Sequence, residues 1–228
     1  MLHRQLAALA LMTAFAFAAT AEATIINTII GNFDIAFDGA SGELTDFNRP
    51  QGGNLDSTEA RTFSSFEVEV GGTTQVMKMN PPDALFGDLL IPNLGAELTT
   101  GALISNAGGM GDPDAFGFDY FAPDGDVLRI GIADISYTLV TTGIPGLNFF
   151  NWFGNGKVTQ QSLDGGAIVY AEDVLISYTA TDVMVIQGTS GASRLVASGA
   201  MTITGEFIPE PTTAALLLLG AGGLVRRR

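Results

Sequence analysis

The sequence predicts an all-β fold, a single β-sandwich of jelly-roll type, on three observations. Apolar and polar residues alternate in many short segments, most regularly in 66–70 and 201–207, and alternation with period two is typical of half-buried strands. Turn-rich pieces that contain glycine separate these segments. No stretch between the two termini shows a sustained 3.6-residue period, so helices are not expected there. Many short strands joined by such turns favour a sandwich.

The expected strands can be placed in order along the chain. They lie at 25–37, 66–70, 75–79, 98–105, 128–132, 135–139, 149–153, 157–163, 167–179, 183–187 and 201–207. Alternation changes register at Ala133 and Asp134, which predicts a β-bulge there because one extra residue moves every later side chain to the other face. The Asp164-Gly165-Gly166 turn between two alternating runs predicts a hairpin. Two long irregular segments, 40–62 and 107–126, interrupt the pattern, and loops of that length are typically functional or disordered.

The first 23 residues have the layout of a secretory signal peptide. A small basic region with His3 and Arg4 precedes an apolar segment, 6–19. Ala21-Glu22-Ala23 then provides an Ala-x-Ala cleavage site before Thr24. We expect residues 1–23 to direct export and to be removed, and the alternative is a buried N-terminal helix.

Residues 209–228 form a second segment that stands apart from the β pattern. It begins with Pro209-Glu210-Pro211, and the two prolines prevent a helix from running through this motif. An uncharged stretch, 212–225, follows and favours an apolar helix. Next comes Arg226-Arg227-Arg228, a cationic block that favours the cytoplasmic side of a membrane. We expect a short C-terminal transmembrane helix over 212–225, and the alternative is an apolar terminus packed on the domain.

This order of features resembles the PEP-CTERM sorting signal of bacterial secreted proteins. The matching residues are Pro209-Glu210-Pro211, the apolar run 214–225 and Arg226-Arg227-Arg228. The resemblance implies recognition by an exosortase, a membrane-embedded transpeptidase-like enzyme. It also implies cleavage near the Pro-Glu-Pro motif, which releases the protein or transfers it at the cell surface, and a link to extracellular polysaccharide. The same segment is sometimes labelled as a C-terminal domain of ice-binding proteins, which does not by itself indicate ice binding.

The segment between the two ends, 24–208, is long enough for one domain with a substantial core, and it is strongly acidic. Of the 24 acidic residues in the chain, Glu22 and Glu210 lie outside this segment, which leaves 22 against six basic residues. Such a surface repels phosphate backbones, so nucleic-acid binding is not expected.

Two residue types that carry much enzyme chemistry are missing from this segment. The chain has no cysteine, and its one histidine, His3, lies in the expected signal peptide. A mature domain without either residue cannot form a Ser-His-Asp triad, a Cys-His dyad or an ordinary zinc site.

A candidate calcium site lies in the second irregular segment, where aspartates occur on a glycine-rich stretch. Calcium prefers hard carboxylate oxygens. The pattern does not match an EF-hand loop, because Phe116 stands at its fifth position and Pro123 at its twelfth. The alternative is a solvated acidic loop, and no other cofactor is expected. The candidate ligands are Asp112, Asp114, Asp119, Asp124 and Asp126.

A candidate glycan platform lies in the aromatic run 148–155, which holds the only tryptophan. Exposed aromatic rings can stack on sugars, and the neighbouring asparagines can bond hydroxyl groups. Phe150 and Trp152 share one strand face. The alternative is that these two rings fill the core while Phe149 and Phe153 cover the other face.

These features predict an exported, non-enzymatic protein that passes through a membrane-anchored precursor to the cell surface or extracellular matrix. The expected partners are the secretion machinery, an exosortase, the membrane through 212–225 before processing, and extracellular polysaccharide. The expected role is structural or adhesive. The alternative is a secreted carboxylate-dependent glycan-active enzyme. Its mechanism requires two carboxyl groups about 5–10 Å apart and does not depend on a histidine.

Overall fold

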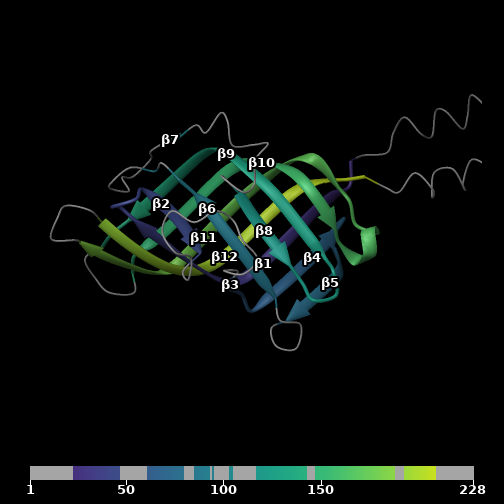
Figure 1. Ribbon diagram of the computed structural model, residues 1–228, viewed down its shortest axis with the longest axis horizontal. Coiled ribbons are helices and arrows are strands. Elements are labelled where there is room, and N and C mark those ends of the chain that lie inside the picture. Colours follow the sequence, from purple (N-terminus) through teal and green to yellow (C-terminus); the bar gives the residue numbers. More distant parts are fainter. Residues whose placement is uncertain are drawn as a thin grey trace, which may run out of the picture.

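The computed structural model describes residues 23–46, 61–79, 85–92, 94, 103–104, 117–142, 147–187 and 193–208. Apart from one short 3-10 turn, η1 (Asp164–Gly166), the regular structure in these ranges consists of β-strands (Figure 1), which confirms the all-β prediction. Across the same ranges, no helix has the length and apolar character that a membrane crossing requires. The strands are β1 (Ile25–Asp38), β2 (Glu43–Asp46), β3 (Arg61–Thr62), β4 (Ser65–Val70), β5 (Thr73–Met79), β6 (Phe86–Ile91), β7 (Leu103–Ile104), β8 (Gly117–Phe121), β9 (Val127–Val140), β10 (Phe149–Ser162), β11 (Tyr170–Gln187) and β12 (Ser193–Phe207).

The sheet closes on itself into an eight-stranded barrel. Hydrogen-bonded neighbours follow the order β12-β11-β10-β9-β8-β6-β2-β1, and β1 pairs in turn with β12. This last pairing is antiparallel and runs from Ile25↔Glu206 to Asp38↔Arg194. The expected jelly-roll sandwich is therefore wrong. A sandwich has two separate sheets, whereas here the two ends of one sheet have joined (Figure 1).

The length and bending of the strands explain why the barrel forms. The sequence predicted two short strands, 149–153 and 157–163, where the structure has the single strand β10, and likewise two where it has β11. Positive φ angles bend the long strands, with φ 54° at Asn32 and 51° at Asp134. The bulge predicted near Asp134 is confirmed, because the pairing of β9 with β10 changes register there. Long strands that twist and bend in this way can meet edge to edge.

Glycine-containing turns join the strands where the sequence predicted them. Gly71 and Gly72 connect β4 to β5 with φ angles of 59° and 76°, which glycine adopts without steric cost and which a tight hairpin turn requires. Gly125, with φ 95°, lies in the turn between β8 and β9. The predicted Asp-Gly-Gly hairpin is confirmed as η1 between β10 and β11.

The hairpin of β4 and β5 stands outside the ring of eight strands. One edge of β1 pairs with β4 over its first half and with β2 over its second half. Side chains join the hairpin to β8 and its turn. The Phe66 and Tyr120 rings stack with centroids 3.9 Å apart and planes at 5°. Lys78 Nζ donates to Asp124 Oδ2 at 2.5 Å and to Asp126 Oδ2 at 2.7 Å.

The ion pairs of Lys78 shift two pKa values, those of Lys78 and Asp124. Burial lowers the pKa of Lys78, but the hydrogen bonds to Asp124 and Asp126 together raise it by more than burial lowers it. The net shift of this pKa is therefore upward. The hydrogen bond from Lys78 lowers the pKa of Asp124. Lys78 and Asp124 are therefore both charged at neutral pH, and the hydrogen bonds of Lys78 attach the hairpin to the barrel.

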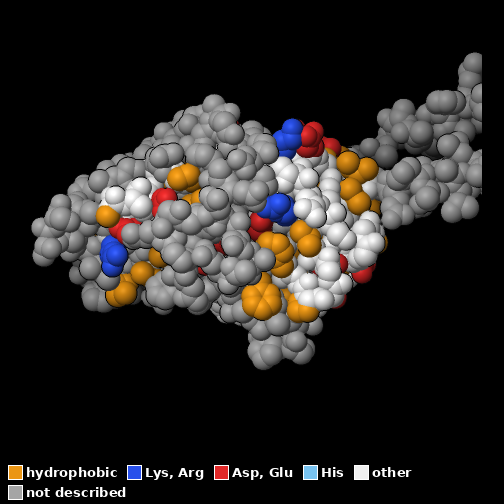
Figure 2. Space-filling view, in the orientation of Figure 1, with side chains coloured by type: hydrophobic (Ala, Val, Ile, Leu, Met, Phe, Trp, Pro, Cys, Tyr) orange, Lys and Arg blue, Asp and Glu red, His pale blue; other side chains and the backbone are white. Residues whose placement is uncertain are grey.

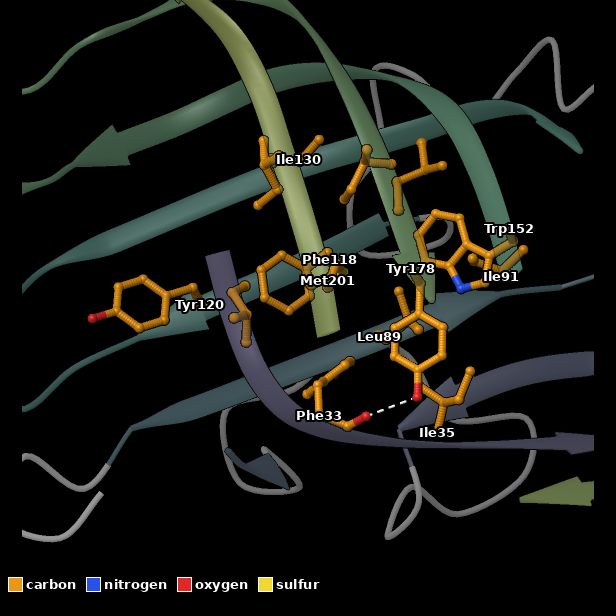
Figure 3. Close-up of a cluster of buried hydrophobic side chains, with 14 of the residues drawn as sticks. Phe33, Ile35, Leu89, Ile91, Phe118, Tyr120, Ile130, Trp152, Tyr178 and Met201 are labelled. Atoms are coloured by element: carbon orange, nitrogen blue, oxygen red, sulfur yellow. Dashed lines mark hydrogen bonds between the residues drawn. The ribbon is translucent and has the colours of Figure 1, made fainter. Parts of the chain in front are cut away.

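The barrel interior is filled by apolar side chains rather than left hollow. An eight-stranded barrel is just wide enough for side chains to fill it. Figure 3 shows the rings of Trp152 and Tyr178 close to Leu89, Ile91 and Ile35, with Phe118 and Met201 in the middle of the cluster. Each of these side chains is at most 1% exposed. The described core therefore leaves the binding of a ligand to the outer face.

Two tyrosines of β11 reach across β12 to β1 inside the barrel. The Tyr178 hydroxyl lies 2.9 Å from the carbonyl oxygen of Phe33 and 3.2 Å from that of Ala197 (Figure 3). The Tyr170 hydroxyl lies 2.5 Å from Thr28 Oγ1. Burial raises the pKa of both phenols. These contacts therefore link β11, β12 and β1 across the pairing of β1 with β12 that closes the barrel.

Replacing Tyr178 by Phe removes one hydroxyl and keeps the ring. We expect the Tyr178→Phe variant to lose about 1–2 kcal/mol of unfolding free energy at neutral pH, because the carbonyl oxygens of Phe33 and Ala197 lose this donor. Urea denaturation followed by the fluorescence of Trp152 measures the change. Ser177→Ala on the adjacent, outward position is the matched control, for which we expect a smaller change. Equal losses in the two variants would contradict the bridging role.

The raised tyrosine pKa values also predict alkaline sensitivity. Above about pH 10, the ordinary tyrosine pKa, the unfolded chain releases these protons while folded Tyr170 and Tyr178 retain them. The stability that these two phenols contribute is therefore fully present below about pH 10, and it is lost as the pH rises further. The double variant Tyr170→Phe/Tyr178→Phe should show a shallower loss in urea titrations across this range. A slope identical to that of the wild type would show that these phenols do not carry the effect.

Candidate functional site

An open groove of about 730 Å³ lies on the outer face of the barrel over β9, β10, β11 and β12. Side chains that point away from the core line much of it, including Leu175, which is 61% exposed. Ile25 at the start of β1 lies at one end and is 43% exposed. The register pairs Ile25 with Glu206, so the groove reaches the end of the barrel where β1 begins and β12 ends (Figure 1).

Two bulges shape this groove. In the pairing of β11 with β12, Tyr170 opposes Phe207 and Val174 opposes Gly205. Three residues of β11, 171–173, therefore lie opposite Glu206 alone. A bulge of this kind bends the strand and redirects its side chains, which places Glu172 and Asp173 beside the groove. On the other side, Asp134 occupies the bulge of β9.

Carboxylates dominate the charge of the groove. Asp134, Glu172, Asp173 and Glu206 line it. Lys157 Nζ lies 2.5 Å from Glu172 Oε1, with the two side chains 40% and 64% exposed. The hydrogen bond with Glu172 raises the pKa of Lys157, so this lysine stays protonated at neutral pH. Among the described residues, the groove therefore carries an excess of negative charge.

A row of polar groups crosses the groove at right angles to the strands. The cross-strand register places Asn155 opposite Leu175, and Leu175 opposite Thr204. Asn155 Nδ2 donates to Asp134 Oδ2 at 3.3 Å on one side of the row. On the other side, Thr204 Oγ1 donates to Asn27 Oδ1 at 2.9 Å. The row thus combines hydrogen-bonding groups with one exposed apolar side chain.

Figure 2 shows where the basic side chains of one face lie relative to the acidic ones. Each patch of Lys or Arg visible on the described part of that face lies beside Asp or Glu. The described ion pairs fit this pattern, with Arg129 Nε 2.9 Å from Asp119 Oδ2 and Arg194 3.6 Å from Asp38. These described basic side chains are thus engaged with carboxylates, and the chain as a whole carries a formal net charge of −14.

The predicted calcium ligands are only partly covered by the structure. Asp112 and Asp114 lie outside the described residues. Asp124 and Asp126 share the ammonium group of Lys78, and Asp119 pairs with Arg129 on the next strand. Within the described ranges, no group of three or more acidic, histidine or cysteine side chains is arranged to hold a metal ion. The complete calcium site stays a prediction.

The two rings predicted to stack on glycans, Phe150 and Trp152, do not lie at the surface. Phe150 and Trp152 are 0% and 1% exposed, and they form part of the barrel core. Phe153, on the other face of β10, is 56% exposed. The alternative of core packing is confirmed for Phe150 and Trp152, because a ring needs an open face to stack on a sugar.

Sequence reasoning missed the groove residues. Glu172, Asp173 and Glu206 are ordinary acidic residues in strand-like segments, and only the register of β11 with β12 brings them together. The one available signal was the predicted bulge at Asp134, which does lie at the groove. The predicted sorting residues, Pro209-Glu210-Pro211 and Arg226-Arg227-Arg228, and residues 1–22 of the predicted signal peptide lie outside the described residues.

Comparison of this chain with protein-family models, with curated proteins and with solved structures finds no match.

Proposed function

We propose that this chain is a non-enzymatic protein that is exported to the cell surface or extracellular matrix, where it acts as a structural or adhesive component in contact with polysaccharide. Two sequence features support the route. Residues 1–23 have the layout of a secretory signal peptide, and 209–228 resemble a PEP-CTERM sorting signal that an exosortase recognises. The uncleaved precursor is held in the membrane through 212–225.

The groove on the outer face is the observation that carries the contact with polysaccharide. Apolar side chains fill the described barrel interior, so a polymer must be bound from outside. The groove offers amide, hydroxyl and carboxylate groups beside exposed Leu175. Small numbers of convergent polar groups beside an apolar surface are typical of ligand sites. The groove is open to the outer face, so a long polymer can reach it without entering the barrel.

A second candidate function is a carboxylate-dependent glycan-active enzyme. It is favoured by Glu172 and Glu206, which line the same groove across the bulge of β11. Hydrolysis of a glycosidic bond by this mechanism needs one carboxyl group to protonate the leaving oxygen and another to act as nucleophile or base.

One incubation separates the two candidates. The full chain is mixed with the producer's own extracellular polysaccharide, and the polymer is then tested for co-sedimented protein and for its chain length. We expect retention of the protein and an unchanged polymer length. Shortening by the wild type that is lost in Glu206→Gln would favour the enzyme, and absence of retention would contradict the adhesive role.

The sorting route is tested on the protein purified from its producing cells. Intact-mass spectrometry should show a mature chain that begins at Thr24 and ends near Pro209-Glu210-Pro211, because both terminal segments are removed during export and sorting. A surface-exposed product that still contains Arg228 would contradict this route. A variant lacking 226–228 serves as the control, and we expect it to be sorted less efficiently.

A further inference from the structure

We propose that the groove over β9–β12 binds an amine-bearing, and therefore cationic, polysaccharide. This inference rests on the proposed polysaccharide contact and narrows it to one chemical class. Three features of the groove support it: the sign of its charge, its row of hydrogen-bonding groups, and its position over strands that each have a neighbouring strand on both sides.

The charge of the groove selects a cationic ligand. Four carboxylates line it, those of Asp134, Glu172, Asp173 and Glu206, and Lys157 is engaged with one of them. The whole chain carries a formal net charge of −14, so its long-range field also attracts cations. Polymers rich in uronate, sulfate or phosphate are repelled, whereas ammonium groups can form charge-assisted hydrogen bonds with the carboxylates.

The row across the groove suits a sugar ring. Asn155 and Thr204 present an amide and a hydroxyl on either side of Leu175 in the cross-strand register. Neighbouring strands lie about 4.8 Å apart, so the amide of Asn155 and the hydroxyl of Thr204 lie on the order of 10 Å apart with Leu175 between them. Hydroxyl groups of a sugar can bond to the polar side chains, while the apolar C–H face of its ring covers exposed Leu175.

The closed sheet argues against a basic peptide as the ligand. Extended peptides commonly bind by adding a strand to an exposed sheet edge. The described strands β10, β11 and β12 each have a hydrogen-bonded strand on both sides, so the groove does not lie at an open sheet edge to which a peptide could add a strand. Recognition must therefore come from side chains, which favours a ligand that carries its own hydroxyl and amine groups.

Calorimetric titration of the full chain tests the proposal at mildly acidic pH, where sugar amines and Asp or Glu carboxylates are both charged. The probes are a glucosamine tetrasaccharide, its N-acetylated counterpart and tetralysine. We expect the glucosamine tetrasaccharide to bind most tightly, with an affinity that falls as salt is added. Asp173→Asn/Glu206→Gln should weaken binding about tenfold or more, because two charge-assisted contacts are lost.

The matched control is Glu67→Gln/Glu69→Gln on β4, which removes the same charge outside the groove and should leave binding unchanged. Thermal melting checks that both double variants fold. Where Asp173→Asn/Glu206→Gln does not fold, the exposed groove variant Asn155→Ala replaces it, with an expected loss of severalfold. A comparable loss in the β4 control, equal binding of the N-acetylated sugar, or equal or tighter binding of tetralysine would each overturn the proposal.

The result is also distinguishable from failure of the proposed function. Retention on the producer's polysaccharide without binding of the glucosamine tetrasaccharide removes the cationic class and keeps the adhesive role. Failure of both removes the adhesive role as well.

Discussion

Strands β1 and β12 hydrogen-bond along almost their entire length, and this pairing closes the sheet. Both edges of the ring are thereby consumed, which removes the exposed edges that an open sheet presents to other chains. Tyr170 and Tyr178 reinforce the closure from inside, since their hydroxyls connect β11 to β1 across β12. Closure also explains the filled interior, because the apolar faces of the strands then point toward the centre of the barrel and pack against one another.

Closure also determines where a ligand can be bound. Because side chains fill the described interior, a ligand is expected to bind at the outer face. The bulges of β9 and β11 shape the surface of that face. These bulges are more than local irregularities. They adapt long strands to the curvature of the barrel, and in doing so they turn Asp134, Glu172 and Asp173 toward one groove. The same geometry therefore serves both the fold and the candidate site.

The sequence contained the strands but not their partners. Alternation placed Phe150 and Trp152 on one face, and it placed the bulge at Asp134, because both depend on neighbouring residues. It could not show that β1 meets β12, since pairing between distant strands leaves no local pattern. For the same reason it could not show that Lys78, 46 residues earlier than Asp124, donates hydrogen bonds to both Asp124 and Asp126.

A disulfide test addresses the closure most directly, because the chain has no native cysteine. Ile29 and Thr202 are cross-strand partners in β1 and β12, and antiparallel partners have Cα atoms about 4.5–5.5 Å apart, within reach of a disulfide. Under oxidation, Ile29→Cys/Thr202→Cys should form an intramolecular disulfide, whereas Ile29→Cys/Glu206→Cys, four residues out of register, should remain reduced. Free thiols in the first variant, or cross-linking in both, would contradict a barrel closed by β1 and β12.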